Sequence, residues 1–393
     1  NTWSHSVLFR AGSASTSIRL EPCVPLQVRV IAVVLRSEAV AYRCLFCCQE
    51  QLHISDGVCN IHSDHFDFAY GTANIMCPVP SGCEAPSRIT VTSAAAQSPF
   101  LEVKNQNVKS DAFPYSFTVC LSTMFDFTNV LQFVQSLEMM QLLGVDRVVV
   151  YKTSCSPETQ RILDYYTHKG LVEVIPWSLS RYLNVSRSWL PALGPGDLHY
   201  FGQIAALNDC LYRYMYRSRY VALQDMDELI LPHWSELLPQ LEQKYGVDRC
   251  YMFENNVFPN TIKLPPPNPP TLPLLASWLN VSGVDILDHL YQEPIIPETH
   301  YSNFKIIVNP RAVFTATVHG VLYERKYYGN NVFVHGMIFK NNVFCLCRGP
   351  RQPHLKPDQL IYDGRLLDYS ARLIPAVSAV LKENGLLEED STH

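Results

Sequence analysis

The spacing of apolar and polar residues divides the chain into two parts. Up to about residue 92, short runs alternate apolar and polar positions between Gly, Pro and Ser, as in residues 26–35, 39–45 and 88–92. Alternation over strands of this length predicts a small antiparallel β-sandwich. Residues 93–111 are mostly small or polar, and we expect a linker there.

From residue 115 the pattern changes to strand-length apolar runs that alternate with segments of helical period. We predict strands at residues 117–121, 147–151, 171–175 and 219–223, and helices at residues 126–143, 157–168 and 199–217. This order predicts an α/β sheet, mostly parallel and covered by helices on both faces. At 393 residues the chain is long enough for two domains, which we expect at residues 1–105 and 106–393.

Three carboxylates follow the last predicted strand, in the run Gln224-Asp-Met-Asp-Glu228. Ligands of α/β sheets bind beyond the carboxyl ends of the strands, and Asp225 and Asp227 lie on the same side of an extended chain. Carboxylates suit hard cations such as Mg²⁺ or Mn²⁺, which proteins usually bind together with substrate phosphates. The run therefore predicts a metal-bound nucleotide site, with an acidic loop or a helix N-cap as the alternative for the triplet alone.

The composition indicates which class of partner the chain can bind and in which cellular compartment it folds. With 47% apolar residues, 17% charged residues and a net charge of −5, the chain is globular and shows no basic stripe that would bind nucleic acid. Seven of the 13 cysteines lie within the first 83 residues, and Asn184 and Asn280 begin N-glycosylation sequons. Together these signals predict an oxidising secretory lumen, disulfides and N-linked glycans.

No apolar run is long enough to span a membrane, and the chain begins with Asn. We therefore expect a fragment whose membrane anchor lies upstream.

Two further clusters have simpler explanations than a metal site. Cys44-Leu-Phe-Cys-Cys48 lacks a second pair at zinc spacing, so we expect disulfides, and His62-Ser-Asp-His65 with Asp67 lacks a helical frame, so we expect a polar loop. The proline-rich residues 263–275 predict a surface loop, either a wall of an acceptor site or an insertion without a role.

Several motifs of the second part resemble glycosyltransferase family 92. They are Val145-Asp-Arg-Val-Val-Val-Tyr-Lys152, Leu163-Asp-Tyr-Tyr166, Gly170-Leu-Val-Glu-Val-Ile-Pro-Trp177, Gln203-Ile-Ala-Ala-Leu-Asn-Asp-Cys210, Leu223-Gln-Asp-Met-Asp-Glu-Leu-Ile-Leu-Pro232, Lys305-Ile-Ile-Val-Asn-Pro310 and Thr317-Val-His-Gly320. The resemblance implies a GT-A (Rossmann-like) α/β domain that follows the small disulfide-rich β-sandwich. It also implies a type II membrane protein of the Golgi lumen that transfers galactose, with inversion and with Mn²⁺ or another divalent cation. The donor would be UDP-galactose, and the acceptor a terminal galactose of glycoprotein glycans that receives a β1,4 linkage.

Site residues follow from the match and from their positions at strand ends. Asp225, Asp227 and His319 are the expected metal ligands, with Asp225 reaching either the metal or the ribose. Lys305 is expected on the diphosphate, and Glu228 as a structural partner. Thr123, Tyr151 and Lys152 are expected near the uracil and ribose, with core packing as the alternative for Tyr151.

Inversion requires a carboxylate base on the acceptor side. The candidates are Glu293 first and Glu298 second, then Asp285, Asp288 and the remoter Glu254. In the family, a histidine and aromatic cluster follows the Val-His pair, whereas this chain has Phe344-Cys-Leu-Cys-Arg348. That departure keeps open a catalytically silent carbohydrate-binding or scaffold protein. A DxD phosphohydrolase is a third possibility, but its triplet would follow the first strand of the sheet.

Overall fold

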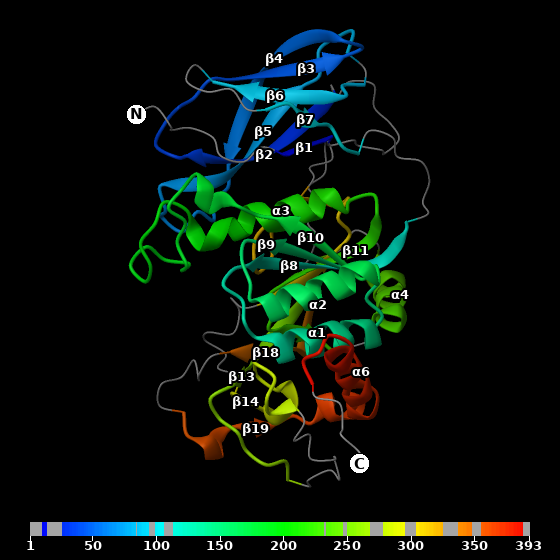
Figure 1. The fold of residues 1–393 in the computed structure, drawn as a ribbon. Helices are drawn as coiled ribbons and strands as arrows, with labels where there is room; N and C mark the ends of the chain where they lie inside the picture. Colours follow the sequence, from blue (N-terminus) through cyan, green and yellow to red (C-terminus); the bar gives the residue numbers. More distant parts are fainter. Residues whose placement is uncertain are drawn as a thin grey trace. The chain divides into compact units, whose positions relative to one another are not determined.

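The computed structural model describes residues 10–13, 26–83, 85–93, 99–105, 113–231, 233–246, 250–267, 278–294, 304–324, 337–347 and 355–387. The chain forms two compact units, coloured along the sequence in Figure 1. The first contains residues 1–114, 177–219 and 315–317, and the second contains residues 115–176, 220–314 and 318–393. The unit that holds the expected first domain thus also takes in two segments from later in the chain.

A seven-stranded antiparallel sheet makes up most of the first unit. Its strands are β1 (Arg10–Ser13), β2 (Gln27–Leu35), β3 (Tyr42–Cys48), β4 (Gln51–Ile61), β5 (Tyr70–Pro78), β6 (Arg88–Thr92) and β7 (Leu101–Glu102), in the order β1-β2-β5-β4-β3-β6-β7. Strand β4 pairs with β3 through residues 51–57 and with β5 through residues 58–61. Because β4 belongs to both halves, the structure has one continuous sheet in place of the two separate sheets expected for a sandwich.

The two halves of this sheet enclose a common core that disulfides fasten. Buried side chains of β2, β3, β5 and β6 form one apolar cluster. Disulfides join Cys44 to Cys77 and Cys48 to Cys83, with Cα atoms 5.9 and 5.5 Å apart. Closing loops of this size stabilises the folded state by about 4 kcal/mol each in the chain-entropy treatment. The prediction of disulfides is therefore confirmed.

Pairing of the N-terminal cysteines is only partial. Cys47 and Cys59 are free thiols, and Cys23 lies outside the described residues.

Residues 177–219 contain two short 3₁₀ helices, η1 (Leu179–Arg181) and η2 (His199–Gly202), followed by α3 (Gln203–Arg213). Helix α3 packs on β2 and β5 of the sheet. The single helix predicted at residues 199–217 begins later than expected, because Tyr200 and Phe201 adopt positive φ angles of 35° and 51° that interrupt helical geometry.

An eight-stranded sheet forms the centre of the second unit. In sheet order, its strands are β10 (Val172–Pro176), β9 (Arg147–Lys152), β8 (Tyr115–Met124), β11 (Ser218–Gln224), β15 (Phe304–Val308), β13 (Cys250–Pro259), β18 (Met337–Cys347) and β12 (Glu228–Ile230). Strands β8, β9 and β10 are parallel, as are β13 and β18. Strand β15 is antiparallel to both of its neighbours, and β12 is antiparallel to β18. The sheet is therefore mixed: the expected parallel pairing holds for β8, β9 and β10 and for β13 with β18, whereas β15 and β12 run antiparallel to their neighbours.

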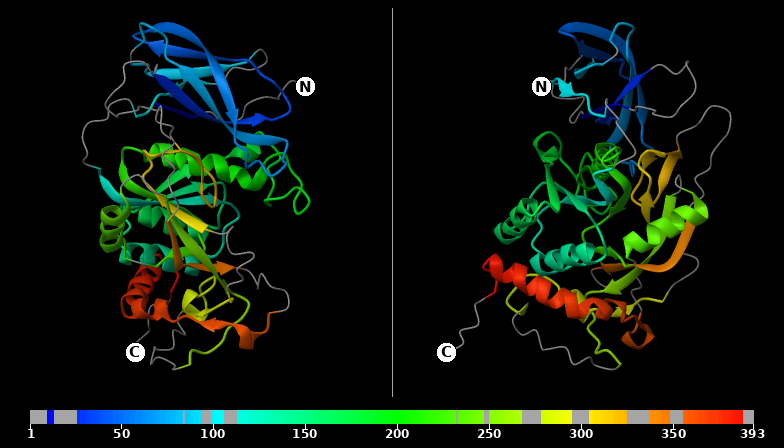
Figure 2. Two further views of the ribbon diagram at one scale, coloured as in Figure 1. Left: turned by 180° about the vertical axis from the view of Figure 1, so that it is seen from behind. Right: turned by 90° about the vertical axis from the view of Figure 1, so that its right-hand side faces the viewer.

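Within the described residues of this unit we find four α-helices: α1 (Val130–Leu142), α2 (Pro157–His168), α4 (Trp234–Tyr245) and α6 (Ser370–Glu383). Helix α1 contacts both α2 and α6 (Figure 2), and their buried side chains join the core of the sheet. The remaining elements are short: η4 (Ile286–Asp288), β14 (Tyr291–Gln292), β16 (Val313–Ala316), β17 (Val321–Glu324), η5 (Pro357–Gln359), β19 (Ile361–Tyr362) and η6 (Arg365–Tyr369). In the part of the chain described, we find no helix with the length and apolar character of a membrane span.

Candidate functional site

The predicted acidic site lies where three strands of the second unit end or begin. Asp225 follows the last residue of β11, and Ser122, near the carboxyl end of β8, hydrogen-bonds to its carboxylate. Lys305 is the second residue of β15, which runs antiparallel to β11 with Leu223 opposite Ile306. The sheet order therefore brings these three side chains together from distant parts of the sequence.

Lys305 holds two of the carboxylates. Its Nζ lies 2.8 Å from Asp225 Oδ2 and 2.9 Å from Glu228 Oε2. The lysine side chain is 1% exposed and Glu228 4% exposed, whereas Asp225 is 29% exposed. The ammonium is thus enclosed by its partners, and the prediction that it lies directly on a donor diphosphate needs correction because almost none of it reaches solvent.

Both carboxylate oxygens of Glu228 are occupied by the protein itself. Oε1 accepts a hydrogen bond from Asn255 Nδ2 at 2.9 Å, and Oε2 accepts one from the backbone N–H of Asp225 at 2.9 Å. The side chain of Gln224 donates to the backbone carbonyl of Glu228 at 2.9 Å. Glu228 therefore shapes the turn that presents Asp225 and Asp227, as expected of a structural partner.

The charges in this cluster do not balance, because three carboxylates share one ammonium. Burial raises the pKa of Asp225, but the charge of Lys305 and the hydrogen bonds from Lys305 and Ser122 outweigh it and keep that pKa below its ordinary value. Burial and the negative charges of Glu228 and Asp225 raise the pKa of Asp227 to about 7. Ionised Asp227 is thus poorly stabilised by the protein, and a cation would be favourable there.

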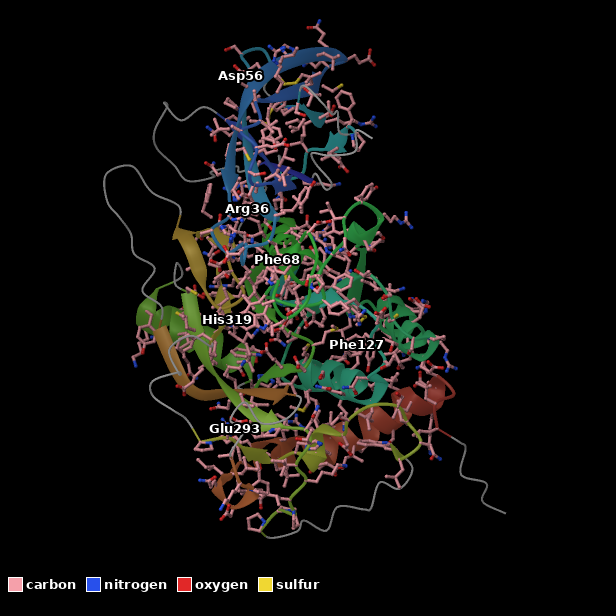
Figure 3. The ribbon with its side chains drawn as sticks, turned by 90° about the vertical axis from the view of Figure 1, so that its left-hand side faces the viewer. Arg36, Asp56, Phe68, Phe127, Glu293 and His319 are labelled. Carbon is pink, nitrogen blue, oxygen red and sulfur yellow. A yellow bond between two sulfur atoms is a disulfide. The ribbon has the colours of Figure 1, made fainter. Side chains whose placement is uncertain are left out.

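His319 belongs to the neighbouring turn that follows β16. Its Nδ1 lies 3.1 Å from the carbonyl oxygen of Phe304, the residue before Lys305. A carbonyl only accepts hydrogen bonds, so Nδ1 carries the proton and Nε2 carries the lone pair that a metal would use. The side chain, labelled in Figure 3, is exposed, and when Nε2 is also protonated its positive charge lowers the pKa of Asp225.

The donor atoms fit a divalent cation in charge and in chemistry, since two partly exposed carboxylates and an imidazole suit Mn²⁺. Across the described residues, however, no three His, Cys, Asp or Glu side chains are arranged so that they could hold a metal ion. A metal site here would need the carboxylates and His319 to approach one another.

The expected donor-binding residues differ in accessibility. Thr123 and Tyr151 are adjacent in the β8–β9 pairing, and both are fully buried. Core packing, the alternative for Tyr151, is therefore its observed state. Lys152 ends β9 and donates a hydrogen bond to Gln160 of α2. Ser122, which contacts Asp225, was missed because nothing distinguishes a serine within an apolar strand until the strand order is known.

The base candidates fall in different surroundings. Glu293 is 6% exposed, and its backbone N–H donates to Val257 at 2.8 Å. Figure 3 shows Glu293 and His319 at separate levels of the second unit. Asp285 caps η4 and accepts a hydrogen bond from Gln135, and Asp288 pairs with Lys263 at the surface, so both have structural roles. Glu298 lies outside the described residues.

Other predicted features can be placed briefly. The backbone pairs Cys345 and Phe344, in the segment that departs from the family, with Glu228 and Leu229. That segment therefore runs beside the acidic turn, while Arg348 and residues 268–277 of the proline-rich region lie outside the described residues. Both sequon asparagines, Asn184 and Asn280, are exposed, as glycosylation requires.

Similarity to known proteins covers this same region. The family model described as Glycosyltransferase family 92 matches residues 115–344, from the first residue of β8 into β18. A Caenorhabditis elegans protein with the name "Glycosyltransferase family 92 protein F13G3.3" is 30% identical over 120 residues. That alignment covers 30% of this chain and 23% of the length of the worm protein.

Proposed function

The chain belongs to glycosyltransferase family 92, and we propose that it transfers galactose from UDP-galactose to a terminal galactose of glycoprotein glycans. The proposal includes inversion at the anomeric carbon, a β1,4 linkage and a GT-A arrangement of the α/β unit. Its main support is the turn from Asp225 to Glu228, where two partly exposed carboxylates remain in excess over one buried ammonium. Such a turn at a strand's carboxyl end suits a nucleotide bound through a cation.

In this proposal Asp225, Asp227 and His319 hold Mn²⁺ or a similar divalent cation. When bound, the cation neutralises the charge that develops on the departing diphosphate. Lys305 keeps Asp225 and Glu228 ionised and in place, since its Nζ lies 2.8 and 2.9 Å from their oxygens. Lys152, at the end of β9, is the most accessible of the residues proposed for the uracil and ribose, because Thr123 and Tyr151 are buried.

For the acceptor side we propose Glu293 as the base, with Glu298 as the second choice. The base must reach the anomeric carbon from the face opposite the diphosphate. The separation of Glu293 from His319 in Figure 3 is compatible with this, because the donor sugar has to lie between base and metal ligands.

The disulfides Cys44–Cys77 and Cys48–Cys83 and the exposed sequons support an oxidising lumen. We propose that the protein acts in the Golgi lumen as a type II membrane protein. Its partners would then be UDP-galactose and glycoprotein glycans, with no role for nucleic acid.

A catalytically silent carbohydrate-binding or scaffold protein is the second candidate. It is favoured by Phe344-Cys-Leu-Cys-Arg348, which stands where relatives carry a histidine and aromatic cluster and which pairs in register with the acidic turn. A DxD phosphohydrolase is disfavoured, since the triplet follows β11 and not the first strand, β8.

One experiment separates these candidates. Release of UDP from UDP-galactose is measured with and without a terminal-galactose acceptor, in Mn²⁺ and in EDTA. A transferase releases UDP in proportion to acceptor and only with the cation, and linkage analysis of the product tests the β1,4 bond. Mn²⁺-dependent binding of UDP without turnover would refute the transferase and support the silent protein.

A further inference from the structure

Asn208 of α3 hydrogen-bonds to Ala316, within the segment 315–317 that precedes His319 in the sequence. The Asn208 side chain donates from Nδ2 to the carbonyl of Ala316 at 2.8 Å and accepts from the N–H of Ala316 at 3.0 Å. Both backbone groups of Ala316 are therefore paired with one side chain. Asn208 is 1% exposed and Ala316 is fully buried, so water cannot replace these bonds.

Side chains from the N-terminal part of the chain also hydrogen-bond to residues 315–317. His62 Nε2 lies 3.1 Å from the Ala316 carbonyl, and His62 Nδ1 accepts a hydrogen bond from the N–H of Asp64 at 3.0 Å. The proton is therefore on Nε2, which donates to Ala316. Thr317 donates its hydroxyl to Asp64, and Asn74 Nδ2 donates to the hydroxyl of Thr315 at 3.4 Å.

Each residue from Thr315 to Thr317 is thus bound by a polar side chain from elsewhere in the first unit. We refer to Asn208, His62, Asn74 and Asp64 as the clamp. Asn208 and His62 are buried, and buried polar groups are costly unless paired, so losing their bonds to Ala316 is unfavourable. The predicted polar loop around His62 is part of it.

The chain connects the clamp to the proposed metal ligand. Only Thr317 and Val318 separate Ala316 from His319, and β16 ends at Ala316. His319 lies three positions beyond the strand end, so displacement of that end also displaces His319. A ligand displaced by about 1 Å loses much of its effect on bound phosphates.

We propose that Asn208 and His62 are positioning residues for His319, which follows the residues that they bind along the chain. This inference rests on the proposed function of His319. It assigns a role in donor binding to a residue of the first domain expected from the sequence, residues 1–105.

The test uses the full chain and a matched control. Asn208→Ala removes both bonds to Ala316, His62→Gln retains a donor, and His62→Ala removes one. Asn105→Ala is the control, because Asn105 Nδ2 donates to the carbonyl of Tyr212 on the same helix at 2.8 Å. Two quantities are measured: amide hydrogen exchange over residues 313–320, and the Kd of UDP in Mn²⁺ by calorimetry.

We expect Asn208→Ala to accelerate exchange at Ala316 and to raise the Kd of UDP, each at least tenfold. His62→Ala should do so to a lesser degree, His62→Gln should approach wild type, and the control should stay within twofold in both. The double variant Asn208→Ala/His319→Ala should bind UDP no more weakly than His319→Ala alone, because the clamp acts through that histidine.

Three results would overturn the inference. Unchanged exchange at Ala316 would show that Asn208 does not hold the segment. Faster exchange with an unchanged Kd, or additive losses in the double variant, would show that the clamp is merely structural. If wild type bound no UDP with Mn²⁺, the proposed function would fail and the positioning role with it, while faster exchange would still establish the clamp.

Discussion

Replacing Lys305 by methionine tests whether the buried ammonium holds the acidic turn together. Methionine fills most of the same volume, so the main change is the loss of the positive charge. Glu228, 4% exposed, then stays buried without its cation, whereas Asp225, 29% exposed, is partly screened by water. Removing one partner of a buried ion pair costs about 3–5 kcal/mol of unfolding free energy, and Glu228 should account for most of it.

The assay is urea unfolding in EDTA, so that no added cation substitutes for the ammonium. In a thermal melt, the same loss of unfolding free energy would lower the melting temperature of a unit of this size by about 10 °C. Lys263→Met is the matched control, because Lys263 pairs with Asp288 at 2.5 Å with side chains 65% and 46% exposed. An exposed pair contributes about 1 kcal/mol or less.

The pH dependence gives a second check on the same variant. Without Lys305, burial raises the pKa of Glu228 further, and a carboxyl whose pKa is higher in the folded state destabilises the fold once it ionises. The deficit of Lys305→Met should therefore be largest at neutral pH and shrink as the pH falls toward the ordinary carboxyl range. A loss below about 1 kcal/mol at neutral pH, or one equal to that of Lys263→Met, would refute this account.

Three further predictions concern single side chains. Asp227→Ala should leave the fold intact and lower transfer to less than about a tenth of wild type, since loss of a metal ligand costs several kcal/mol of barrier; activity above that level would exclude a direct ligand role. Glu293→Gln should lower the transfer rate by roughly 10² at nearly constant donor affinity; near-normal transfer would move the base to Glu298. His199 is 3% exposed, and burial lowers its pKa to about 4. Protonation then favours the unfolded chain, so stability should decline by about 3 kcal/mol between pH 6.5 and 4, and an identical pH profile for His199→Gln would contradict this.

Local signals in the sequence were enough to place some elements accurately. Helix α2 runs over the predicted residues 157–168 because Ser156 caps it, Pro157 opens it and Gly170, with φ of 81°, follows its end. Strand β4 had no such signal. Its apolar residues Leu52, Ile54 and Val58 are 63%, 58% and 59% exposed, so the usual relation between apolar positions and burial is reversed.

Of the candidate site, too, only a part could be predicted from the sequence. Only Met226 separates Asp225 from Asp227 in the sequence, and their position directly after a strand was enough to predict the site. The partners Ser122, Asn255 and Lys305 come from β8, β13 and β15, and only the strand order shows that they meet there. No local pattern encodes a mixed sheet in which β15 runs antiparallel between β11 and β13.

The buried contacts of α3 show why residues 1–105 are not a detachable module. Arg29 of β2 is 1% exposed, and its guanidinium lies 4.3 Å from the ring of Tyr212 on α3 and donates to the Tyr212 hydroxyl. A buried cation depends on partners that stay in place. Tyr212 lies within residues 115–344, which match the family, whereas Arg29 lies outside them. A chain reduced to the matched range would leave the inner face of α3 and the backbone of Ala316 without these partners, so the family-matched range requires the N-terminal sheet to complete its fold.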